Sequence, residues 1–249
     1  MAQYDVADRS AIVTGASSGL GRRFVQVLRD AGAEVVAAAR RTDRLEALAA
    51  ETGAVPVTAD VSDPEDVDRL VATTLERFGR VDVLVNNAGI GTTVPAEDEP
   101  IEEFCRVFDV NVTSLFRLSQ AVGRHMLAAG RGSIVNVASI LGLVASAPIK
   151  QAGYAASKGA VVNLTRELGC QWARKGVRVN AIAPGWFPSE MTQHMFGDER
   201  SEEFVRRNCP MGRFGTETEL DGALLFLAGD ASTYVTGHVL VVDGGYTAQ

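Results

Sequence analysis

The sequence predicts an α/β fold, in which one domain is built on a parallel sheet of seven strands with helices on both faces. Short apolar runs alternate with amphipathic stretches along most of the chain, and several runs are apolar almost throughout, as strands buried on both faces are. The chain holds 25 glycines but only 6% aromatic residues, which favours closely packed helix–sheet layers over an all-β sandwich. Regular strand–helix alternation gives a parallel sheet with right-handed crossovers.

The composition fits one domain and argues against several functions. With 249 residues, 46% of them hydrophobic, the chain can bury a large core. A net charge of -7 argues against nucleic acid or an anionic membrane as a partner. We find neither a signal-peptide core nor a run near the ~20 apolar residues of a membrane span. Cys105, Cys170 and Cys209 have neither zinc nor disulfide spacing, which predicts reduced thiols in a cytoplasm and no metal site.

Four strands are predicted in the amino-terminal half, each from a short apolar run. They lie at 11–13, 34–39, 55–58 and 81–85. The helix after the first strand has one apolar face and ends at Gly32, a suitable C-cap. A second helix is expected at 43–50. The third begins at Ser62–Glu65, which offers a capping box and a first-turn proline, and it runs to about Phe78.

Three more strands are predicted in the carboxyl-terminal half. They lie at 133–138, 177–182 and 238–242. One long helical region covers 101–129 and contains Asn111, a second helix spans 153–174, and a third spans 218–228. Residues 186–214 mix polar and apolar positions without a strand pattern, so we expect them to form a mobile lid over the substrate.

Polar or glycine-rich segments follow the strands at one edge of this sheet. They are the glycine turn Thr14–Gly21, Asp60, Asn86, Ser139 and Pro184. In open parallel sheets, ligands bind beyond the carboxyl ends of the strands. The glycine turn joins a strand directly to a helix, so a pyrophosphate can approach its backbone and the helix N-terminus. This edge is therefore predicted to bind a dinucleotide, the alternative for the turn being a plain strand–helix connection.

Tyr154 and Lys158 are four residues apart on a predicted helix, and this spacing places two side chains on one face. A free tyrosine titrates near pH ~10, too high for a proton shuttle at neutral pH. One positive charge ~4 Å away lowers a pKa by about three units at an effective dielectric of ~20. The spacing also arises by chance, and a solvated lysine beside a half-buried tyrosine is the alternative interpretation.

In this order and spacing the motifs resemble those of the short-chain dehydrogenase/reductase family, which has a Rossmann-like fold. The resemblance covers the chain from Thr14 to Gly245. It rests on Thr14–Gly21, Asp60-Val61, Asn86–Gly89, Asn111, Ser139, Tyr154-x-x-x-Lys158 and Pro184-Gly185.

The resemblance implies an oxidoreductase that interconverts a ketone and a secondary alcohol by hydride transfer. Tyr154 would be the general acid in reduction and the base in oxidation. Lys158 would lower the pKa of Tyr154 and hold the nicotinamide ribose, and Ser139 would hydrogen-bond the substrate oxygen. Asn111 would distort its helix and hold a water that relays protons through Lys158, or else simply cap a helix kink.

The resemblance also implies a set of cofactor-binding residues. They are Gly15, Ser17, Ser18, Gly19, Leu20, Gly21, Arg40, Arg41, Asp60, Val61, Asn87, Ala88, Gly89, Tyr154, Lys158, Pro184, Gly185 and Ser189. Asp60 would accept a hydrogen bond from the adenine amino group, and Asn87 would stabilise the neighbouring strand end. Ser189 stands where many relatives carry a threonine that binds the nicotinamide carboxamide, and Thr192 is a second candidate.

The end of the second strand favours NADP(H) over NAD(H), although NAD(H) stays open. A carboxylate at this place receives the ribose 2′-hydroxyl and repels a 2′-phosphate. Here the position holds Ala39, and Arg40 and Arg41 follow, whose guanidinium groups suit a phosphate. Ser18 is not the basic residue that many NADP-using relatives place in the glycine turn.

The substrate is left open by these motifs. A 3-oxoacyl-thioester reductase is the first alternative, and Arg131, Arg174 and Lys175 could contact its acidic carrier, although helix-end cations also have a dipole explanation. A non-catalytic dinucleotide sensor on the same fold is an alternative of a different class. An epimerase or dehydratase is disfavoured, since the resemblance gives those enzymes a further carboxyl-terminal domain.

Two further expectations concern the partners. A compact, largely apolar small-molecule substrate is expected because apolar side chains crowd the predicted pocket: Leu141, Leu143, Val144, Ile149, Trp186, Phe187, Met191, Met195 and Phe196. The same residues could only pack the lid onto the sheet. A homotetramer is expected from the resemblance and from apolar residues on the two long helices that could pair across a two-fold axis: Val107, Phe108, Val112, Leu115, Val161, Val162, Leu164 and Leu168.

Overall fold

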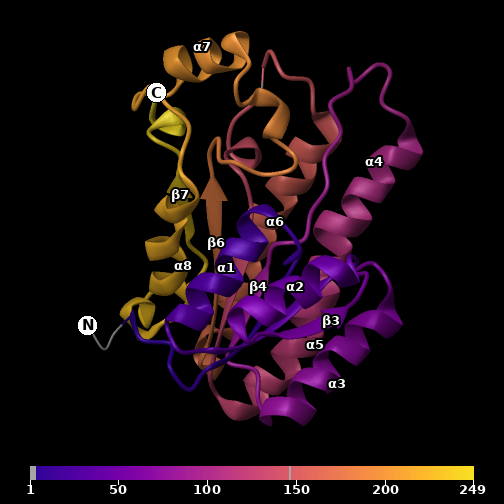
Figure 1. Ribbon diagram of the computed structural model, residues 1–249, viewed down its shortest axis with the longest axis vertical. Coiled ribbons are helices and arrows are strands. Elements are labelled where there is room, and N and C mark those ends of the chain that lie inside the picture. Colours follow the sequence, from indigo (N-terminus) through magenta and orange to yellow (C-terminus); the bar gives the residue numbers. More distant parts are fainter. Residues whose placement is uncertain (1–3, 146) are drawn as a thin grey trace.

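The computed structural model describes residues 4–145 and 147–249, and seven strands form its single parallel sheet (Figure 1). The strands are β1 (Ser10–Thr14), β2 (Glu34–Ala39), β3 (Val55–Thr58), β4 (Val83–Asn86), β5 (Gly132–Val137), β6 (Val177–Pro184) and β7 (Val239–Val242). Their order in the sheet is β3-β2-β1-β4-β5-β6-β7, and every neighbouring pair is parallel. The predicted fold class is confirmed. Residues 1–3 and 146 lie outside the described residues.

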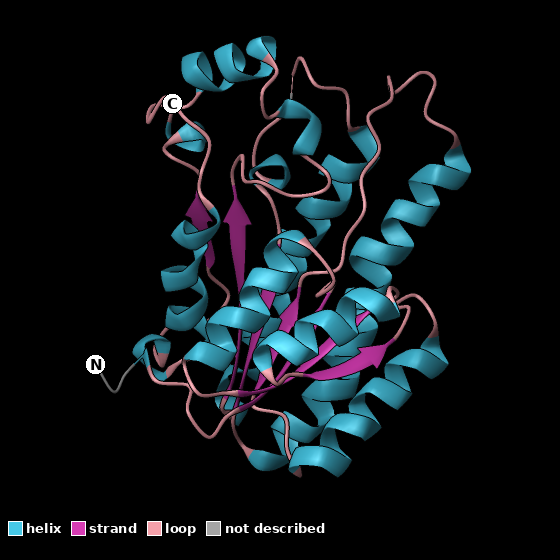
Figure 2. Ribbon diagram, viewed as in Figure 1, coloured by secondary structure: helices cyan, strands magenta, loops and turns pink. Residues whose placement is uncertain are grey.

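Helices cover both faces of the sheet, as Figure 2 shows. One face carries α1 (Gly19–Asp30), α2 (Thr42–Thr52) and α8 (Asp221–Ala228). The other carries α3 (Pro64–Phe78), α5 (Ser114–Ala129) and α6 (Ala152–Trp172). The remaining helices are α4 (Ile101–Phe108), which packs on α6, and α7 (Glu199–Asn208).

Burial on both faces explains why the strands read as apolar runs. On β1, Ala11 and Val13 belong to the core under α1 and α8, whereas Ile12 belongs to the core under α3 and α5. Successive strand residues point to opposite faces, so a strand covered on both sides is apolar at most of its positions. All five residues of β1 and all four of β4 are buried.

The start of α3 differs in detail from its prediction. Asp63 is the N-cap residue, and its carboxylate accepts a hydrogen bond from the backbone N–H of Glu65. Pro64 occupies the first turn as expected. The predicted capping box is not formed, because the Ser62 hydroxyl donates to Asp60 over 2.6 Å and the helix begins one residue too late for Ser62 to cap it.

The long helical region predicted at 101–129 is interrupted. A π-helical turn, Asp109–Thr113, separates α4 from α5, and Asn111 lies buried within it. The local distortion expected at Asn111 is therefore present. π-Turns inside helices often mark functional sites.

Residues 186–214 lie beyond the carboxyl ends of β6 and β7, where Figure 1 shows α7. As expected, no strand is assigned among them. Trp186 and Met195 are buried there with Val205 of α7 in one apolar cluster, so this segment packs down firmly on the sheet edge. None of the helices in the described ranges is long and apolar enough to cross a membrane.

Candidate active site

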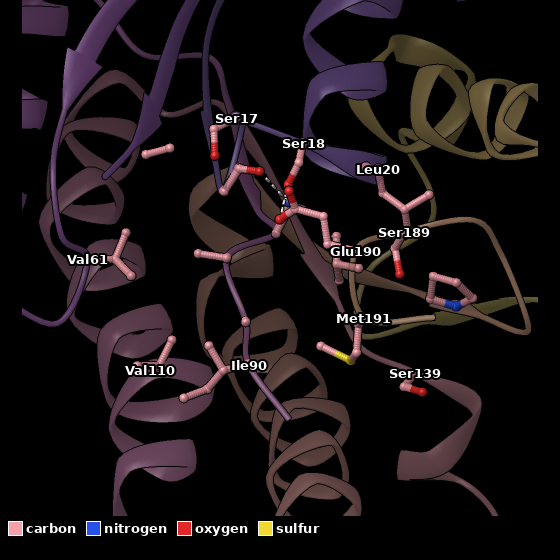
Figure 3. Close-up of a pocket in the computed structure, with 18 of the residues that line it drawn as sticks. Ser17, Ser18, Leu20, Val61, Ile90, Val110, Ser139, Ser189, Glu190 and Met191 are labelled. Carbon is pink, nitrogen blue, oxygen red and sulfur yellow. Dashed lines mark hydrogen bonds between the residues drawn. The ribbon is translucent and has the colours of Figure 1, made fainter. Parts of the chain in front are cut away.

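A cavity of about 430 Å³ opens at the carboxyl ends of the strands and collects most of the predicted site. Every predicted cofactor-binding residue except Gly21 lines it, and so do the predicted catalytic residues except Asn111. Figure 3 shows Ser17 and Ser18 at one end, Ser139 toward the other, and Ser189 and Met191 along one wall. The ends of six strands, β1 to β6, thus contribute to one site at the sheet edge that the sequence predicts.

The glycine turn allows the backbone of α1 to pack directly on β1 and β4. A Cβ atom on Gly21 would lie 2.2 Å from the Gly15 carbonyl oxygen, so no side chain fits there. Gly15 has a φ of +65° and faces Asn87. The Asn87 amide donates to the Thr14 carbonyl over 3.0 Å, and the Thr14 hydroxyl accepts from the backbone N–H groups of Asn87 and Ala88. Asn87 therefore holds the neighbouring strand end as predicted.

This end of the cavity fits a dinucleotide. The turn presents backbone without side chains, and the N-terminus of α1 begins at Gly19, which lines the cavity. Helix N-termini favour phosphate groups. Asp60 lines the cavity nearby; burial raises its pKa, but hydrogen bonds from Ser62 and the charge of Arg40 outweigh this and hold the pKa below its usual value. An ionised carboxylate is a hydrogen-bond acceptor, which suits the adenine amino group.

The two arginines after β2 point in different directions. Ala39 is buried at the strand end and offers no carboxylate. Arg40 is two-thirds exposed, and its guanidinium lies 3.9 Å from the Asp60 carboxylate. Arg41 turns to the glycine turn and donates to the hydroxyl of Ser17 over 2.9 Å and to that of Ser18 over 2.9 Å.

Three of the predicted catalytic side chains lie at the other end of the cavity. Tyr154 lies on the first turn of α6, and a hydrogen bond links it to Ser139, which follows β5. Lys158 is buried one turn later on α6, and its ammonium lies 5.7 Å from the centre of the Tyr154 ring. The ammonium donates to the Val137 carbonyl over 2.7 Å. The helical spacing of Tyr154 and Lys158 and the place of Ser139 at a strand end thus predicted three side chains that the structure brings together here.

The pKa of Tyr154 departs from the sequence argument. Lys158 was expected to lower it, but burial raises the pKa of the phenol, opposed by the Ser139 hydrogen bond. Burial also lowers the pKa of Lys158 to about 8. The ammonium is directed to a carbonyl and the tyrosine is desolvated, so in this structure desolvation outweighs the attraction that the helical spacing suggested.

Asn111 holds the loop after β4 in place. Its side-chain oxygen accepts from the backbone N–H of Ile90 over 2.8 Å, and its amide donates to the Ile90 carbonyl over 2.9 Å. The amide also donates to Ser157, whose hydroxyl donates to the Tyr154 carbonyl. The side chain therefore connects α6 to the cavity wall but does not line the cavity.

The strand end after β6 supplies the last cavity wall. Pro184, Gly185 and Ser189 line it, as does Thr192. The hydroxyls of Ser189 and Thr192 lie 2.9 Å apart, and Thr192 also donates to the Phe187 carbonyl. Both candidates for the carboxamide contact are therefore present at the same place.

Five of the nine apolar residues assigned to the substrate pocket fall into two groups. Phe187 and Met191 line the cavity. Leu141, Trp186 and Met195 are instead buried in the cluster that attaches residues 186–214 to the sheet edge. For these three, packing of the segment was the correct one of the two interpretations.

Several residues that line the cavity carried no assignment from sequence, among them Ala59, Ile90, Val110 and Glu190, and neither did Arg44, which contacts Glu190. Glu190 accepts hydrogen bonds from Arg41, Arg44 and Ser18. Its place directly after Ser189 could have put it near the cavity, but no local pattern reveals its arginine partners. No cluster of three or more possible metal-binding side chains occurs within 4–145 and 147–249.

Comparison with known proteins agrees with this site. A family model described as enoyl-(acyl carrier protein) reductase matches residues 15–247. Gluconate 5-dehydrogenase of Gluconobacter oxydans is 39% identical over 251 residues, covering 99% of this chain and 97% of the relative. A 3-oxoacyl-(acyl-carrier-protein) reductase of Thermotoga maritima is 36% identical over 239 residues, covering 94% and 96%.

A solved structure resembles the chain over its whole length. The gluconate 5-dehydrogenase of Burkholderia cenocepacia J2315, in complex with NADP and tartrate, superposes with a TM-score of 0.94 at 34% identity, covering 100% of this chain and 98% of that one. The fold, the cavity and these likenesses define an oxidoreductase that acts on alcohols and ketones. The chain belongs to the short-chain dehydrogenase/reductase family.

Proposed function

We propose that the protein is an NADP(H)-dependent oxidoreductase that interconverts a ketone and a secondary alcohol, with Tyr154 as general acid and base. One observation carries the proposal: Ser139, Tyr154 and Lys158 lie in the same cavity as the glycine turn and Arg41. A phosphate-binding end and a proton-transfer end are therefore parts of one continuous site.

The residues of this site have complementary tasks. Burial raises the pKa of Tyr154, so the phenol keeps its proton at neutral pH and can give it to a carbonyl oxygen. Ser139 is placed to hydrogen-bond the same oxygen and stabilise the charge that develops on it. Lys158 provides a positive charge beside the phenolate that remains. When bound, the nicotinamide supplies hydride in reduction and accepts it in oxidation.

Replacing Tyr154 by phenylalanine tests the chemical role. The expected result is a loss of nearly all turnover with cofactor affinity within about threefold of the wild type, because the phenol acts in the transition state while the ring still packs. Tyr234, which is fully exposed, gives the matched control Tyr234→Phe with unchanged turnover. A Tyr154→Phe enzyme that keeps a tenth of its activity would remove the phenol from the mechanism, and cofactor binding without turnover in the wild type would favour the sensor alternative.

NADP(H) is favoured because Ala39 leaves the end of β2 uncharged and two arginines follow it. The structural relative from Burkholderia, in complex with NADP, supports this choice. Arg41→Ala should lower kcat/KM for NADPH about tenfold to a hundredfold and leave that for NADH nearly unchanged, since a charge-assisted contact contributes about 1.5–3 kcal/mol. Because Arg40 faces Asp60, Arg40→Ala should have the smaller effect. A wild-type preference for NADH would contradict the proposal.

A 3-oxoacyl-thioester reductase stays the second candidate, since the Thermotoga relative carries that name. The carrier contact proposed for Arg131, Arg174 and Lys175 is not supported. These residues precede β5 and β6, at the opposite edge of the sheet from the cavity. Initial rates with ketones, keto-sugars and 3-oxoacyl thioesters would decide between the substrates.

Two further assignments are part of the proposal. Residues 186–214 act as a lid, because they supply Ser189 and Met191 to the cavity while α7 covers the sheet edge. Cys105, Cys170 and Cys209 are free thiols, which fits a reducing compartment, and we infer a cytoplasmic location.

A further inference from the structure

Arg41, Arg44 and Ser18 form an anion-binding cradle at the mouth of the cavity. Arg41 donates to both carboxylate oxygens of Glu190, over 2.8 and 2.9 Å, in a bidentate pair. Ser18 donates to the same carboxylate over 2.9 Å, and Arg44 donates to it as well. Four donors from three residues therefore converge on one carboxylate, and Figure 3 shows Ser18 and Glu190 pointing toward each other.

The cradle lies where a ribose 2′-phosphate would be recognised. Arg41 is the N-cap residue of α2, and only Arg40 separates it from β2. The end of this strand receives the 2′ position in dinucleotide folds. Ser18 belongs to the glycine turn, and Ser18, Arg41 and Glu190 all line the same cavity. A phosphate monoester offers three oxygens to donors that here bind the two of Glu190.

Glu190 is also connected along the chain to residues that lie nearer Tyr154. Its neighbours in sequence, Ser189 and Met191, both line the cavity. The Met191 sulfur would lie 3.5 Å from a Cβ atom on Gly91, and the Tyr154 ring would lie 3.0 Å from the same atom. A movement of Glu190 out of the cradle therefore shifts the part of residues 186–214 that stands beside the tyrosine.

We propose that Glu190 occupies the 2′-phosphate site as a built-in competitor, and that a bound 2′-phosphate displaces it and releases residues 186–192 from α1 and α2. This inference rests on the proposed function, because it assumes that the cavity binds a dinucleotide. It makes Glu190 a specificity-determining residue, which weakens NADP(H) binding relative to NAD(H).

Charge prevents both anions from sharing the cradle. Arg41 and Arg44 bring two positive charges, which a phosphate monoester of about -1.5 to -2 already neutralises. The carboxylate would then be an additional negative charge a few ångströms from the phosphate. With a hydroxyl at the 2′ position this conflict is absent, and the Glu190 contacts can persist. The affinity for a 2′-phosphate is thus reduced by the fraction of molecules in which Glu190 fills the cradle.

Binding measurements on Glu190→Gln test the competition directly. The probes are adenosine 2′,5′-bisphosphate and NADP⁺, each compared with its partner without the 2′-phosphate, 5′-AMP and NAD⁺, by titration calorimetry. Removing the carboxylate charge should tighten both 2′-phosphorylated ligands about tenfold, as expected if Glu190 fills the cradle in about nine molecules of ten. The other two ligands should change less than about twofold. Glu199→Gln, an exposed carboxylate of α7, is the matched control and should change none of them.

Hydrogen exchange at residues 186–192 supplies a readout that does not depend on activity. In the wild type, adenosine 2′,5′-bisphosphate should speed exchange in this segment and 5′-AMP should not; in Glu190→Gln exchange should already be fast. Equal changes in affinity for phosphorylated and unphosphorylated ligands would overturn the proposal, and so would weaker binding of both bisphosphate and NADP⁺. If wild type and variant bind neither dinucleotide, the proposed function fails with it. If both dinucleotides bind and turn over but Glu190→Gln has the same preference between NADP⁺ and NAD⁺ as the wild type, only the proposed competition by Glu190 is wrong.

Discussion

Lys158 is a buried cation that the proposed mechanism uses and that the fold accommodates at a cost in stability. Its side chain is almost fully buried, and its ammonium has the Val137 carbonyl as hydrogen-bond partner. Burial lowers the pKa of the group from 10.5 to about 8, which shows that the charged form is less stable inside the protein than in water. The charge that would stabilise a phenolate in catalysis therefore destabilises the folded chain.

The stability of the protein should depend on pH through this residue. In the unfolded chain Lys158 titrates near its ordinary pKa, so between about pH 8 and 10.5 the unfolded state binds one proton more than the folded state. Stability then rises with pH across this window, and the destabilisation is fully present below it. Between pH 7 and 9.5 this group alone should add about 2 kcal/mol to the free energy of unfolding.

Lys158→Met should abolish that contribution. Urea unfolding at pH 7 and at pH 9.5, at one protein concentration, measures the difference between the two free energies of unfolding. The wild-type difference should exceed that of the variant by about 2 kcal/mol, since the other titrating groups are common to both. Equal differences would mean that Lys158 keeps an ordinary pKa in the folded protein.

At the scale of elements, the first turn of α6 is held by a residue from outside the helix. The N-cap residue, Gln151, makes no side-chain cap bond among the described residues. The Glu99 carboxylate instead accepts from the backbone N–H of Gly153 over 3.1 Å and from the Thr92 hydroxyl over 3.0 Å. Since Tyr154 is the next residue of this turn, Glu99 fixes the place from which the phenol reaches the cavity.

We expect Glu99→Ala to act as a positioning defect. It should lower kcat about tenfold while the cofactor Kd stays within twofold, and it should cost about 1 kcal/mol of stability, as loss of a helix cap does. Glu99→Gln, which keeps an acceptor oxygen, should recover most of kcat. Glu97→Ala, an exposed change two residues away, is the control. A fall in stability with an unchanged kcat would show that Glu99 matters to the fold alone.

Whether a feature could be predicted from the sequence depends on how far apart along the chain its interacting residues lie. Strand positions and the segments after them depend on local apolar runs and glycines, so the sheet and its binding edge were predictable. Spacing within one helix identified Tyr154 and Lys158 as a pair. The prediction of a capping box at Ser62 was wrong because the same local pattern also fits a turn. In that turn the Ser62 hydroxyl donates to the Asp60 carboxylate.

The parts that sequence did not reveal depend on contacts between distant segments. Glu190 meets Arg44 across 146 residues of sequence, and Glu99 meets Gly153 across 54. Neither contact has a periodic or compositional signal, because a surface carboxylate looks the same whether it is solvated or paired. The sequence did not reveal the raised pKa of Tyr154 either, because burial of a side chain is a property of the assembled site.

At the scale of the whole molecule, the apolar residues first assigned to a subunit interface belong mainly to the core. Val107, Leu115, Val161, Val162 and Leu168 are all buried within the single chain. They were misassigned because these helices pack on the sheet and also on each other, α4 against α6 and α3 against α5. The large apolar side chains that α4 and α5 do leave exposed are Ile101 and Phe116, at 65% and 42%.

A homotetramer is still the expected assembly, now with Ile101 and Phe116 in place of the buried set. Exposed apolar side chains on helices are covered when two copies pair across a two-fold axis. Light scattering at micromolar concentration should give a mass near four times the 26.4 kDa of one chain. Phe116→Asp should shift the mass to a smaller species, because a carboxylate at the centre of a helix pair would be buried without a partner. Tyr234→Asp, a change at a fully exposed position outside these helices, should leave the tetramer intact. A wild-type mass near that of one chain would contradict the assembly, whereas a tetramer that survives Phe116→Asp would place its interface on other elements.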